Sequence, residues 1–438
     1  MRRRNRHFIT GLDVGTTKIC AIVGEMADDG INILSVLSHP STGLKKGVVI
    51  DIEATANSIR KVIQDTEDQT GISLREVYVG IAGSHIKNFQ SFGAIGVKGR
   101  EVTPEDVERA IDSAKAVYVP LDREVLHVIP TDFVLDGQEG IKDPVGMSGV
   151  RLEVKVNIIT GAVTSVQNLL KCCERAGLEV LDIVLQPLAS AEATLTADEQ
   201  DMGIALVDIG GGTTDIAVYR EGWLRHTAIL GIGGHHFTND ISIGLRVPLH
   251  EAERVKRMHG SALPPDHHDR TEVEVVAIDG HVRVIPKSYV AEIIQPRAEE
   301  LLDLVKQEIQ SIHGSGVPVL GMVVTGGASL LAGFDRAAEA ILSMPVRIGY
   351  PIQAHQAFSS KGSAVKFQRS HGIYGLKGEF NDPMYATGIG LVLYGAGDAE
   401  PEEKEIFTPD LWTKVMDTMS DWFKRITGGR NANEHKRV

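Results

Sequence analysis

The sequence predicts an α/β fold of two related lobes, with an α+β subdomain inserted into the first lobe and an amphipathic helix near the end. An Asp-x-Gly turn followed by Thr-Thr occurs at Asp13 and again at Asp208, 208 − 13 = 195 residues later, between apolar strands both times. A repeat this long indicates duplication rather than a solenoid. Between the two copies the pattern changes to short strands and a helix, and beyond residue 395 it changes again to an acidic, then amphipathic, segment.

The composition is that of a folded protein. The chain has 438 residues, 42% of them hydrophobic, which allows a sizeable core and about three domains. Its 45 Lys and Arg against 58 Asp and Glu give a net charge of −13, which argues against nucleic acid as a partner. The cysteines, Cys20, Cys172 and Cys173, form no disulfide framework and fit a reducing cytoplasm. No uncharged apolar run reaches about 18 residues, so we expect any membrane contact to be peripheral.

The first lobe is predicted to open with a hairpin. Apolar segments at 8–12 and 19–24 flank the polar turn Asp13–Lys18. Helical spacing and buried-strand runs continue beyond it, on both sides of the inserted subdomain. The elements predicted to complete this lobe are helices at 54–68 and 164–176 and strands at 77–83 and 179–185.

The stretch from about 85 to 160 is predicted to be the inserted α+β subdomain. It begins with a short strand near 92–97. Thr103 as N-cap and Pro104 at the first helical position then signal a helix. The subdomain is predicted to end with strands at 125–130 and 153–160.

The second lobe is predicted to repeat the opening hairpin around the turn Asp208–Asp215. A third glycine-bearing turn, Thr325–Leu330, follows an apolar strand at 319–324. Residues 353–381 are polar and carry glycines, so we expect a loop there. The other predicted elements are strands at 273–278 and 282–285 and a helix at 289–312.

The end of the sequence predicts an acidic linker at 396–408 and an amphipathic helix at 409–427. Pro409 at the first helical position starts the helix, and Gly428-Gly429 stops it. Its Lys and Arg balance its Asp residues, so we expect lipid adhesion through apolar burial, with modest salt dependence. The alternative is a helix packed on the protein's own core. The apolar face consists of Trp412, Val415, Met416, Met419, Trp422, Phe423 and Ile426.

Glycine-rich turns between strands can bind phosphate, because several backbone amides converge where no Cβ blocks the approach. Two such turns could grip a polyphosphate from opposite sides while Asp13 and Asp208 orient a hydrated Mg²⁺, which needs few carboxylates. Lys18 would add a positive charge, and Gly326-Gly327 would admit a flat base or ribose. The alternative is three unrelated tight turns. Hydroxyl donors are available at Thr16, Thr17, Thr213 and Thr214.

The ordered set of turns resembles the actin-like ATPase superfamily, which includes actins, heat-shock chaperones and sugar kinases. The resemblance covers about residues 8–395 and implies ATP and Mg²⁺ as ligands, with Mg²⁺ held through water by Asp13 and Asp208. It also implies catalytic roles for Asp13, Asp208 and Gln186, although a capping or packing role for Gln186 is an equal alternative. The implied nucleotide-binding residues are Gly15, Thr16, Thr17, Lys18, Gly210, Gly211, Gly212, Thr213, Thr214, Gly233, Gly234, Glu253, Lys256, Gly326, Gly327, Ala328 and Ser329.

Within the superfamily, the segments Val125–Pro130, Gln138–Arg151 and Asp382–Leu391 are similar to the FtsA family of bacterial division proteins, as is the position of the inserted subdomain. This resemblance implies a scaffold, with at most slow ATP hydrolysis, that forms filaments on the inner membrane, anchors FtsZ there and recruits later division proteins. Arg297 and Glu300 are the implied docking residues for the terminal peptide of FtsZ, and a solvated helix pair is the alternative. An adaptor of pilus-assembly type and a sugar-kinase-type enzyme are the competing functions.

The resemblance also implies a division into subdomains. Subdomain 1A would take residues 1–85 and 160–200, 1C residues 86–159, 2A residues 201–234 and 313–395, and 2B residues 235–312.

Overall fold

The computed structural model describes residues 7–27, 30–99, 101–265, 268–313, 318–351, 372–376 and 378–399. Residues 1–397 form one compact unit and residues 398–438 a second. The helix predicted at 409–427, with all seven residues of its apolar face, lies outside the described residues. Within the described part, no helix is long and apolar enough to cross a membrane.

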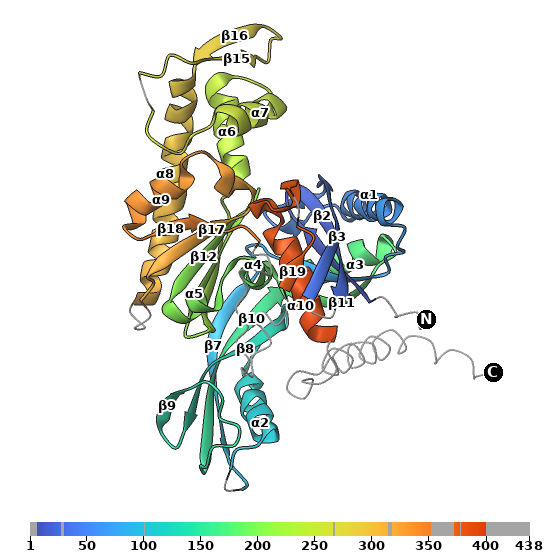
Figure 1. Cartoon of the computed structure of the whole chain (residues 1–438), viewed down its shortest axis with the longest axis vertical. Helices are drawn as coiled ribbons and strands as arrows, with labels where there is room; N and C mark the ends of the chain where they lie inside the picture. Colours follow the sequence, from blue (N-terminus) through green and yellow to red (C-terminus); the bar gives the residue numbers. More distant parts are fainter. Residues whose placement is uncertain are drawn as a thin grey trace, which may run out of the picture. The chain divides into compact units, whose positions relative to one another are not determined.

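Each of two lobes is built on a central sheet (Figure 1). Lobe 1 has a six-stranded sheet in the order β11-β6-β1-β2-β3-β19, and lobe 2 has a five-stranded sheet in the order β14-β13-β12-β17-β18. The strands of lobe 1 are β1 (Phe8–Val14), β2 (Lys18–Ala27), β3 (Gly30–Pro40), β6 (Glu76–Ile81), β11 (Glu179–Leu185) and β19 (Gly372–Tyr374). Those of lobe 2 are β12 (Ile204–Ile209), β13 (Thr214–Arg220), β14 (Trp223–Leu230), β17 (Gly321–Thr325) and β18 (Val346–Ile348).

The two sheets confirm the predicted duplication. In lobe 1, β1, β2 and β3 form an antiparallel meander, and β6 and β11 follow parallel to β1. In lobe 2, β12, β13 and β14 form the same meander, followed by β17 and β18 in parallel. Asp13 pairs with Cys20 in lobe 1, and Asp208 pairs with Asp215 in lobe 2. Each residue of the second pair lies 195 positions after its counterpart in the first pair. The fold is the predicted actin-like one.

Helices cover both sheets. In lobe 1, α1 (Ile52–Thr70) and α3 (Val163–Arg175) pack on one face through one apolar cluster with the strands. In lobe 2, a second cluster joins its sheet to α6 (Gly234–Leu245), α7 (Leu249–His259), α8 (Lys287–His313) and α9 (Phe334–Leu342). The hairpin of β15 (Glu272–Val276) and β16 (Val282–Pro286) adjoins α7 and α8.

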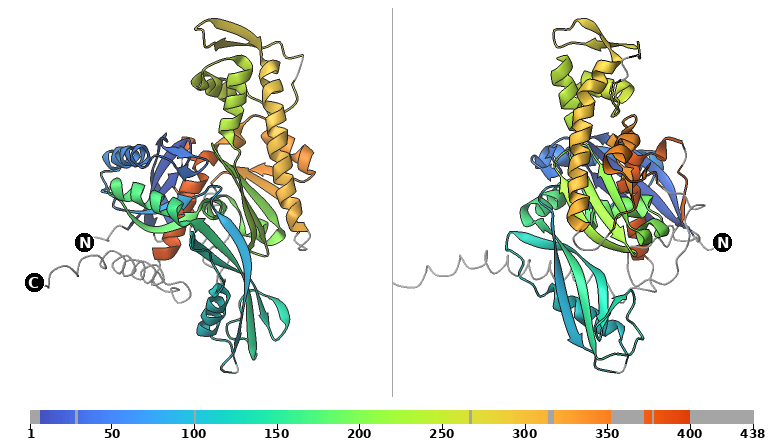
Figure 2. Two further views of the ribbon diagram at one scale, coloured as in Figure 1. Left: turned by 180° about the vertical axis from the view of Figure 1, so that it is seen from behind. Right: turned by 90° about the vertical axis from the view of Figure 1, so that its left-hand side faces the viewer.

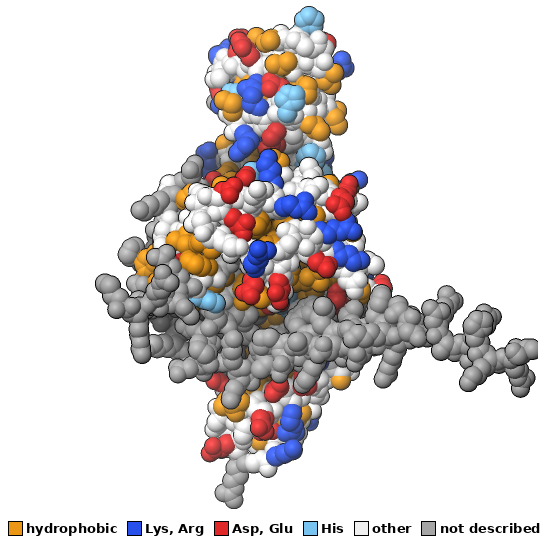
Figure 3. All heavy atoms as spheres, turned by 90° about the vertical axis from the view of Figure 1, so that its right-hand side faces the viewer, with side chains coloured by type: hydrophobic (Ala, Val, Ile, Leu, Met, Phe, Trp, Pro, Cys, Tyr) orange, Lys and Arg blue, Asp and Glu red, His pale blue; other side chains and the backbone are white. Residues whose placement is uncertain are grey.

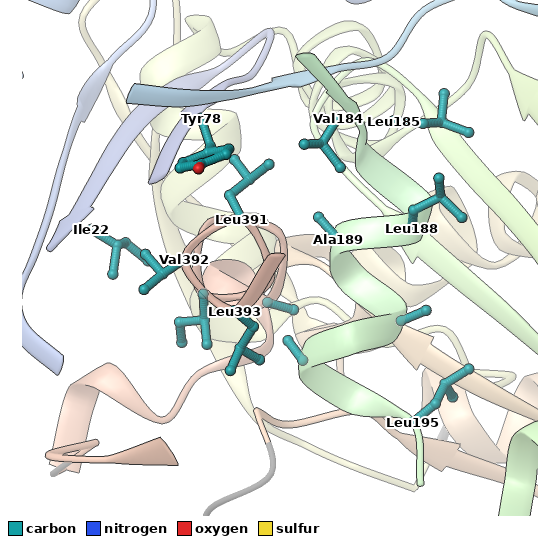
Figure 4. Packing of buried hydrophobic residues seen from close by; sticks show 14 of the residues in the cluster. Ile22, Tyr78, Val184, Leu185, Leu188, Ala189, Leu195, Leu391, Val392 and Leu393 are labelled. Atoms are coloured by element: carbon teal, nitrogen blue, oxygen red, sulfur yellow. The ribbon is translucent and has the colours of Figure 1, made fainter. Parts of the chain in front are cut away.

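Two helices cross between the lobes: α4 (Gln186–Thr194) and α10 (Ala386–Ala399). Their apolar side chains belong to one buried cluster that also includes strands of both lobes (Figure 4). The approach is close, because a Cβ on Gly390 would lie 1.7 Å from the carbonyl oxygen of Ala189. These helices therefore connect the two lobes through a shared core.

The inserted subdomain is a four-stranded sheet in the order β7-β10-β8-β9, which we call the inserted sheet, with α2 (Pro104–Lys115) packed on it. It lies at the opposite end of the first unit from β15 and β16 (Figure 2). Thr103 caps α2 through a capping box with Asp106, as its sequence predicts. The strands are β7 (Lys87–Gly96), β8 (Arg123–Leu135), β9 (Gln138–Ile141) and β10 (Arg151–Ala162).

Some predicted elements need correction. The prediction of a loop at 353–381 is wrong for residues 372–380. There β19 pairs with β3 in parallel, and a 3-10 turn spans Gly378–Phe380. Residues 352–371 of that loop lie outside the described part. The linker predicted from 396 begins too early, because α10 continues to Ala399. The strand β3 and the short helix α5 (Ala197–Met202) were not predicted from the sequence.

Candidate functional site

The two predicted Asp turns face each other across the lobes. We call Asp13–Lys18 the first Asp turn and Asp208–Asp215 the second. A Cβ on Gly211 would lie 2.3 Å from Cγ2 of Thr17, and a Cβ on Gly212 would lie 2.7 Å from Oγ1 of Thr16. Only glycine permits this approach, so the second turn needs its glycines to meet the first.

The two Asp residues that begin these turns are buried near each other. Asp13 and Asp208 are both 6% exposed. Burial raises the pKa of Asp13 to about 6, with the Lys18 ammonium opposing the shift and the Asp208 charge adding to it. Burial also raises the pKa of Asp208, and the hydroxyls of Ser190 and Thr387 oppose that shift. The fold thus places two carboxyl groups where ionisation is costly.

Asp215 adds a third buried carboxyl group to this cluster. Its pKa is raised well above the ordinary range by burial and by the charge of Asp208. Its Oδ1 atom is buried and has no hydrogen-bond partner among the described residues. A buried oxygen without a donor is the kind of group that a cation or an ordered water satisfies.

The crossing helices hold both Asp carboxylates in place. Gln186, the first residue of α4, donates from Nε2 to Oδ1 of Asp13 over 2.9 Å. Ser190, one turn further on α4, donates to Oδ2 of Asp208 over 2.6 Å, and Thr387 of α10 donates to the same oxygen over 3.1 Å. The side chain of Gln186 therefore reaches the cluster, while the residue preceding the helix, Leu185, is its N-cap.

Ser190 and Thr387 were missed by the sequence analysis. Thr387 lies within the Asp382–Leu391 segment that the FtsA resemblance singles out, so that segment was an available signal. Ser190 follows Gln186 by one helical turn, which places both side chains on the same side of α4. Neither residue belongs to a glycine motif.

Lys18 is held by the segment that leads into α10. Its ammonium donates to the carbonyl oxygen of Met384. It also lies 4.7 Å from the centre of the Tyr385 ring, a cation–π distance. Lys18 thus joins lobe 1 to this segment.

The third predicted turn, Gly326–Ser329, reaches the same cluster, and we call it the glycine turn. Gly326 has a left-handed φ of 83°, and a Cβ there would lie 2.3 Å from Oδ1 of Asp208. Its N–H donates to the carbonyl oxygen of Pro383 over 3.2 Å. A Cβ on Gly234 would lie 3.2 Å from the Cβ of Ala328. Ser329 is buried, and its hydroxyl donates to the carbonyl oxygen of Gly326.

The predicted residues of α6 and α7 also meet at this site. The N–H of Gly234 donates to the carbonyl oxygen of Gly210 over 2.8 Å, which ties α6 to the second Asp turn. A Cβ on Gly233 would lie 2.7 Å from that same oxygen. Lys256 donates to the carbonyl oxygen of Gly234 over 3.0 Å and to Oε2 of Glu253 over 2.7 Å.

The other predicted residues of the turns make contacts within the turns or beside them. Thr214 uses its hydroxyl to donate to the carbonyl oxygen of Ile232, and Thr213 lies 3.5 Å from the Asp215 carboxylate. Gly15 closes the first turn by donating its N–H to the carbonyl oxygen of Lys18 over 3.0 Å. The structure thus brings all three glycine-bearing turns and the α6–α7 residues together.

Arg297 and Glu300 lie elsewhere, on α8. Arg297 donates from Nε to Oδ2 of Asp240 over 2.7 Å and from its second terminal nitrogen to Oδ1 over 3.2 Å. It also contacts the carboxylate of Glu300 one turn away. Arg297 is therefore part of an ion-pair group between α6 and α8.

Comparisons with known proteins give the chain its family. A family model described as "Cell division protein FtsA" matches residues 205–390, and one described as "SHS2 domain inserted in FTSA" matches residues 83–160. The FtsA of Pseudomonas aeruginosa is 43% identical over 390 residues, which is 89% of each chain. The FtsA of Escherichia coli strain K12 is 36% identical over 439 residues, which is 97% of this chain and 99% of the relative.

Solved structures confirm the fold. The "PilM-PilN type IV pilus biogenesis complex" has a TM-score of 0.62 at 18% identity, covering 90% of this chain and 99% of that chain. At this identity the likeness extends to the fold alone, whereas the curated relatives are similar in sequence over nearly their whole length. By its sequence, its inserted subdomain and its duplicated sheets, this chain belongs to the FtsA family of cell division proteins.

Proposed function

We propose that the protein binds ATP, polymerises on the inner face of the cell membrane, anchors FtsZ filaments there and recruits later division proteins. Its family supports the cell-division role over the pilus-adaptor and sugar-kinase alternatives. The observation that carries the nucleotide part is the meeting of the two Asp turns and the glycine turn around Asp13 and Asp208. We propose the subdomain boundaries given above as the units of this scaffold.

The glycine turns would bind the nucleotide through their backbone amides. The N–H groups of residues 16–17 and 211–213 would approach the phosphates, since glycine leaves room for them. Lys18 would exchange the carbonyl oxygen of Met384 for a phosphate oxygen. Glu253 and Lys256 would contact the ribose and the base beside Gly326–Ser329.

The acidic cluster fits a hydrated Mg²⁺. Asp13, Asp208 and Asp215 are buried, and their pKa values are raised. Oδ1 of Asp215 receives no hydrogen bond from the described residues. We propose that Asp13 and Asp208 hold the ion through water. When bound, the ion would neutralise phosphate charge. Gln186 would hold the Asp13 carboxylate in position, in keeping with a scaffold that hydrolyses ATP slowly at most.

Residues 235–312 would dock the terminal peptide of FtsZ, with Arg297 meeting its acidic groups. Because Arg297 is already bound to Asp240 and Glu300, an acidic peptide would have to replace one of them. Exposed apolar side chains are present in this segment, among them Ile243 on α6 and Met258 on α7. Figure 3 shows hydrophobic side chains among mixed charges at the end of the molecule that holds β15 and β16. An apolar patch with a cation suits a short amphipathic peptide.

The docking role can be measured with a labelled FtsZ terminal peptide. Arg297→Ala should weaken its binding about tenfold, as expected for one charge-assisted contact. The control is Arg175→Ala, which removes an exposed arginine paired with Glu53 outside residues 235–312. Equal binding by both variants and the unsubstituted chain would assign Arg297 to helix pairing alone.

The membrane part is tested by sedimentation with anionic-lipid vesicles, ATP and Mg²⁺. Three chains are compared: the whole chain, one ending at Ala399, where α10 ends, and Trp422→Glu. The whole chain should sediment with vesicles and the other two should not. A fourth chain, Trp422→Phe, is the control: it keeps the apolar face and should sediment.

Salt separates apolar from electrostatic adhesion in the same experiment. Raising the ionic strength should reduce vesicle binding only modestly, because Lys414, Lys424 and Arg425 are balanced by Asp410, Asp417 and Asp421. A steep loss of binding at high salt would refute apolar burial as the main force. If every chain stays in the supernatant, the proposal that the terminal helix anchors the protein to the membrane is refuted.

A further inference from the structure

A short loop in lobe 1 reaches the site without belonging to any of its glycine motifs. It is the turn Lys46–Gly47, which joins β4 (Leu44–Lys45) to β5 (Val48–Val49), and is called here the Lys46 loop. Lys46 has a left-handed φ of 50°, which costs a side-chain-bearing residue about 1–2 kcal/mol. A conformation of this kind persists only where the surroundings hold it.

The surroundings that hold the loop belong to the first Asp turn and β6. The N–H of Gly47 donates to Oγ1 of Thr16 over 3.0 Å. A Cβ on Gly47 would lie 2.8 Å from the carbonyl oxygen of Ala82, so the loop is pressed against the chain that follows β6. Thr16 is also the residue that meets Gly212, so the Lys46 loop and the second Asp turn both contact the first Asp turn at Thr16.

The Lys46 side chain crosses from lobe 1 to lobe 2. A Cβ on Gly231 would lie 3.5 Å from its ammonium nitrogen. The next residue, Ile232, accepts a hydrogen bond from the Thr214 hydroxyl over 2.8 Å, so this stretch is attached to the second Asp turn. Burial lowers the pKa of His236, and the charges of Arg297 and Lys46 lower it further, which also places the Lys46 charge near the start of α6.

Lys46 differs from the neighbouring cations in having no assigned anion. Lys256 is bound to Glu253, and Arg297 is bound to Asp240. Over the described part of the chain, no hydrogen bond or ion pair holds the Lys46 ammonium, and the side chain is exposed. A polyphosphate entering beside three buried carboxyl groups would be stabilised by a further positive charge besides Lys18 and the proposed Mg²⁺.

We propose that Lys46 is a further phosphate-binding residue, whose ammonium binds the outermost phosphate of a nucleoside triphosphate and thereby joins the two lobes. This rests on the proposed nucleotide binding. The glycine turn lies beside Gly234 and Asp208, whereas Lys46 lies beside Gly231 and is held through Thr16. Lys46 is therefore on the side of the site formed by the first Asp turn, where we place the terminal phosphate.

The test compares ATP and ADP binding, measured by calorimetry with Mg²⁺. Lys46→Asn removes the charge and keeps a residue that tolerates the left-handed backbone. It should weaken ATP binding about tenfold while ADP binding stays within about twofold, and Lys46→Arg should bind ATP as the unsubstituted chain does. The matched control is Lys45→Asn, the same charge change at the exposed neighbouring position, which should change neither affinity.

The outcomes separate this proposal from the one on which it rests. Equal losses for ATP and ADP would mean that Lys46 only shapes the loop, and no loss for either would mean that it remains solvated; both overturn the assignment while nucleotide binding stands. An unsubstituted chain that binds neither nucleotide would overturn both proposals.

Discussion

At the scale of single residues, the fold buries acidic groups where a site can use them. Asp13 is the last residue but one of the buried strand β1, and burial raises its pKa, with the charge of Asp208 adding to the shift. Between its ordinary value of 3.8 and about 6, the folded chain holds a proton at Asp13 that the unfolded chain has lost. The apoprotein therefore loses stability as the pH rises through this range, because the buried carboxylate must become charged.

Asp13→Asn should remove that loss. At neutral pH we expect the variant to unfold at a higher temperature than the unsubstituted chain, whereas near pH 3.8 the two should be alike. ATP with Mg²⁺ is expected to stabilise the unsubstituted chain at neutral pH, and this stabilisation should disappear in Asp13→Asn. Thermal unfolding across this range, with and without the nucleotide, measures both.

The control for this series is Asp112→Asn on α2, an Asp with an exposed side chain paired to Lys115. It should leave the nucleotide effect intact. If Asp13→Asn is no more stable than the unsubstituted chain at neutral pH, the charge of Asp13 does not destabilise the folded protein.

The contact between the Asp turns also depends on single residues. In Gly211→Ala the new Cβ would overlap the side chain of Thr17, which would push the two turns apart. In Gly210→Ala the new Cβ would lie 3.4 Å from the carbonyl oxygen of Thr213, an ordinary contact. We therefore expect ATP binding to weaken at least about tenfold in Gly211→Ala and to change little in Gly210→Ala. Equal affinities in the two variants would contradict a site formed by the meeting of these turns.

At the scale of elements, the crossing of α4 and α10 links the site to the core between the lobes. Ser190 and Thr387, one from each helix, donate to the same oxygen of Asp208 and lie 3.0 Å from each other. Close packing of Gly390 on the backbone of Ala189 sets the separation of the helices. A change in how α4 and α10 cross would therefore alter the hydrogen bonds to the Asp208 carboxylate.

Gly390→Ala should destabilise the protein strongly. The new Cβ would lie 1.7 Å from a backbone oxygen, which cannot turn aside as a side chain can, so we expect a loss of about 3 kcal/mol or more. Gly397→Ala on the same helix has open space around its Cβ, and replacing a helical glycine there should be neutral or stabilise by up to about 1 kcal/mol. Urea unfolding of the two variants makes the comparison, and a small loss in Gly390→Ala would show that the helices can separate freely.

At the scale of the whole first unit, the inserted sheet bridges both lobes. Its chain leaves and re-enters lobe 1, between β6 and α3, yet it packs on β14 of lobe 2. Trp223 of β14 is buried in its core, edge-on to Phe133 at 6.2 Å. Asn157 adds a hydrogen bond of 2.9 Å to the carbonyl oxygen of Leu224. A rotation of one lobe against the other would therefore move or strain the inserted sheet.

Trp223→Ala should loosen this bridge. We expect a loss of about 3–5 kcal/mol of stability, with faster amide exchange in β8 and β10 as well as in β14. Trp223→Phe keeps an aromatic ring against Phe133 and should behave nearly as the unsubstituted chain. Faster exchange confined to β14 would mean that the inserted sheet does not depend on lobe 2.

The sequence by itself determined the features that local rules control. Apolar segments on both sides of polar turns located the hairpins, and Thr103 with Pro104 located the start of α2, because strand runs, turns and capping are set by neighbours in the chain. The repeated Asp turns predicted two lobes, and the paired registers at Asp13 and Asp208 have that symmetry. The same motifs predicted most residues that now surround the acidic cluster.

Only the tertiary structure decided which distant residues complete the site. Ser190 and Thr387 are 197 residues apart, yet they hold one carboxylate oxygen. Lys46 reaches Gly231 from another lobe, and β19 joins β3 after a long intervening segment. These contacts result from the packing of two sheets and two crossing helices. Packing brings together residues that are far apart in the chain, and no periodicity or motif in the sequence marks such pairs.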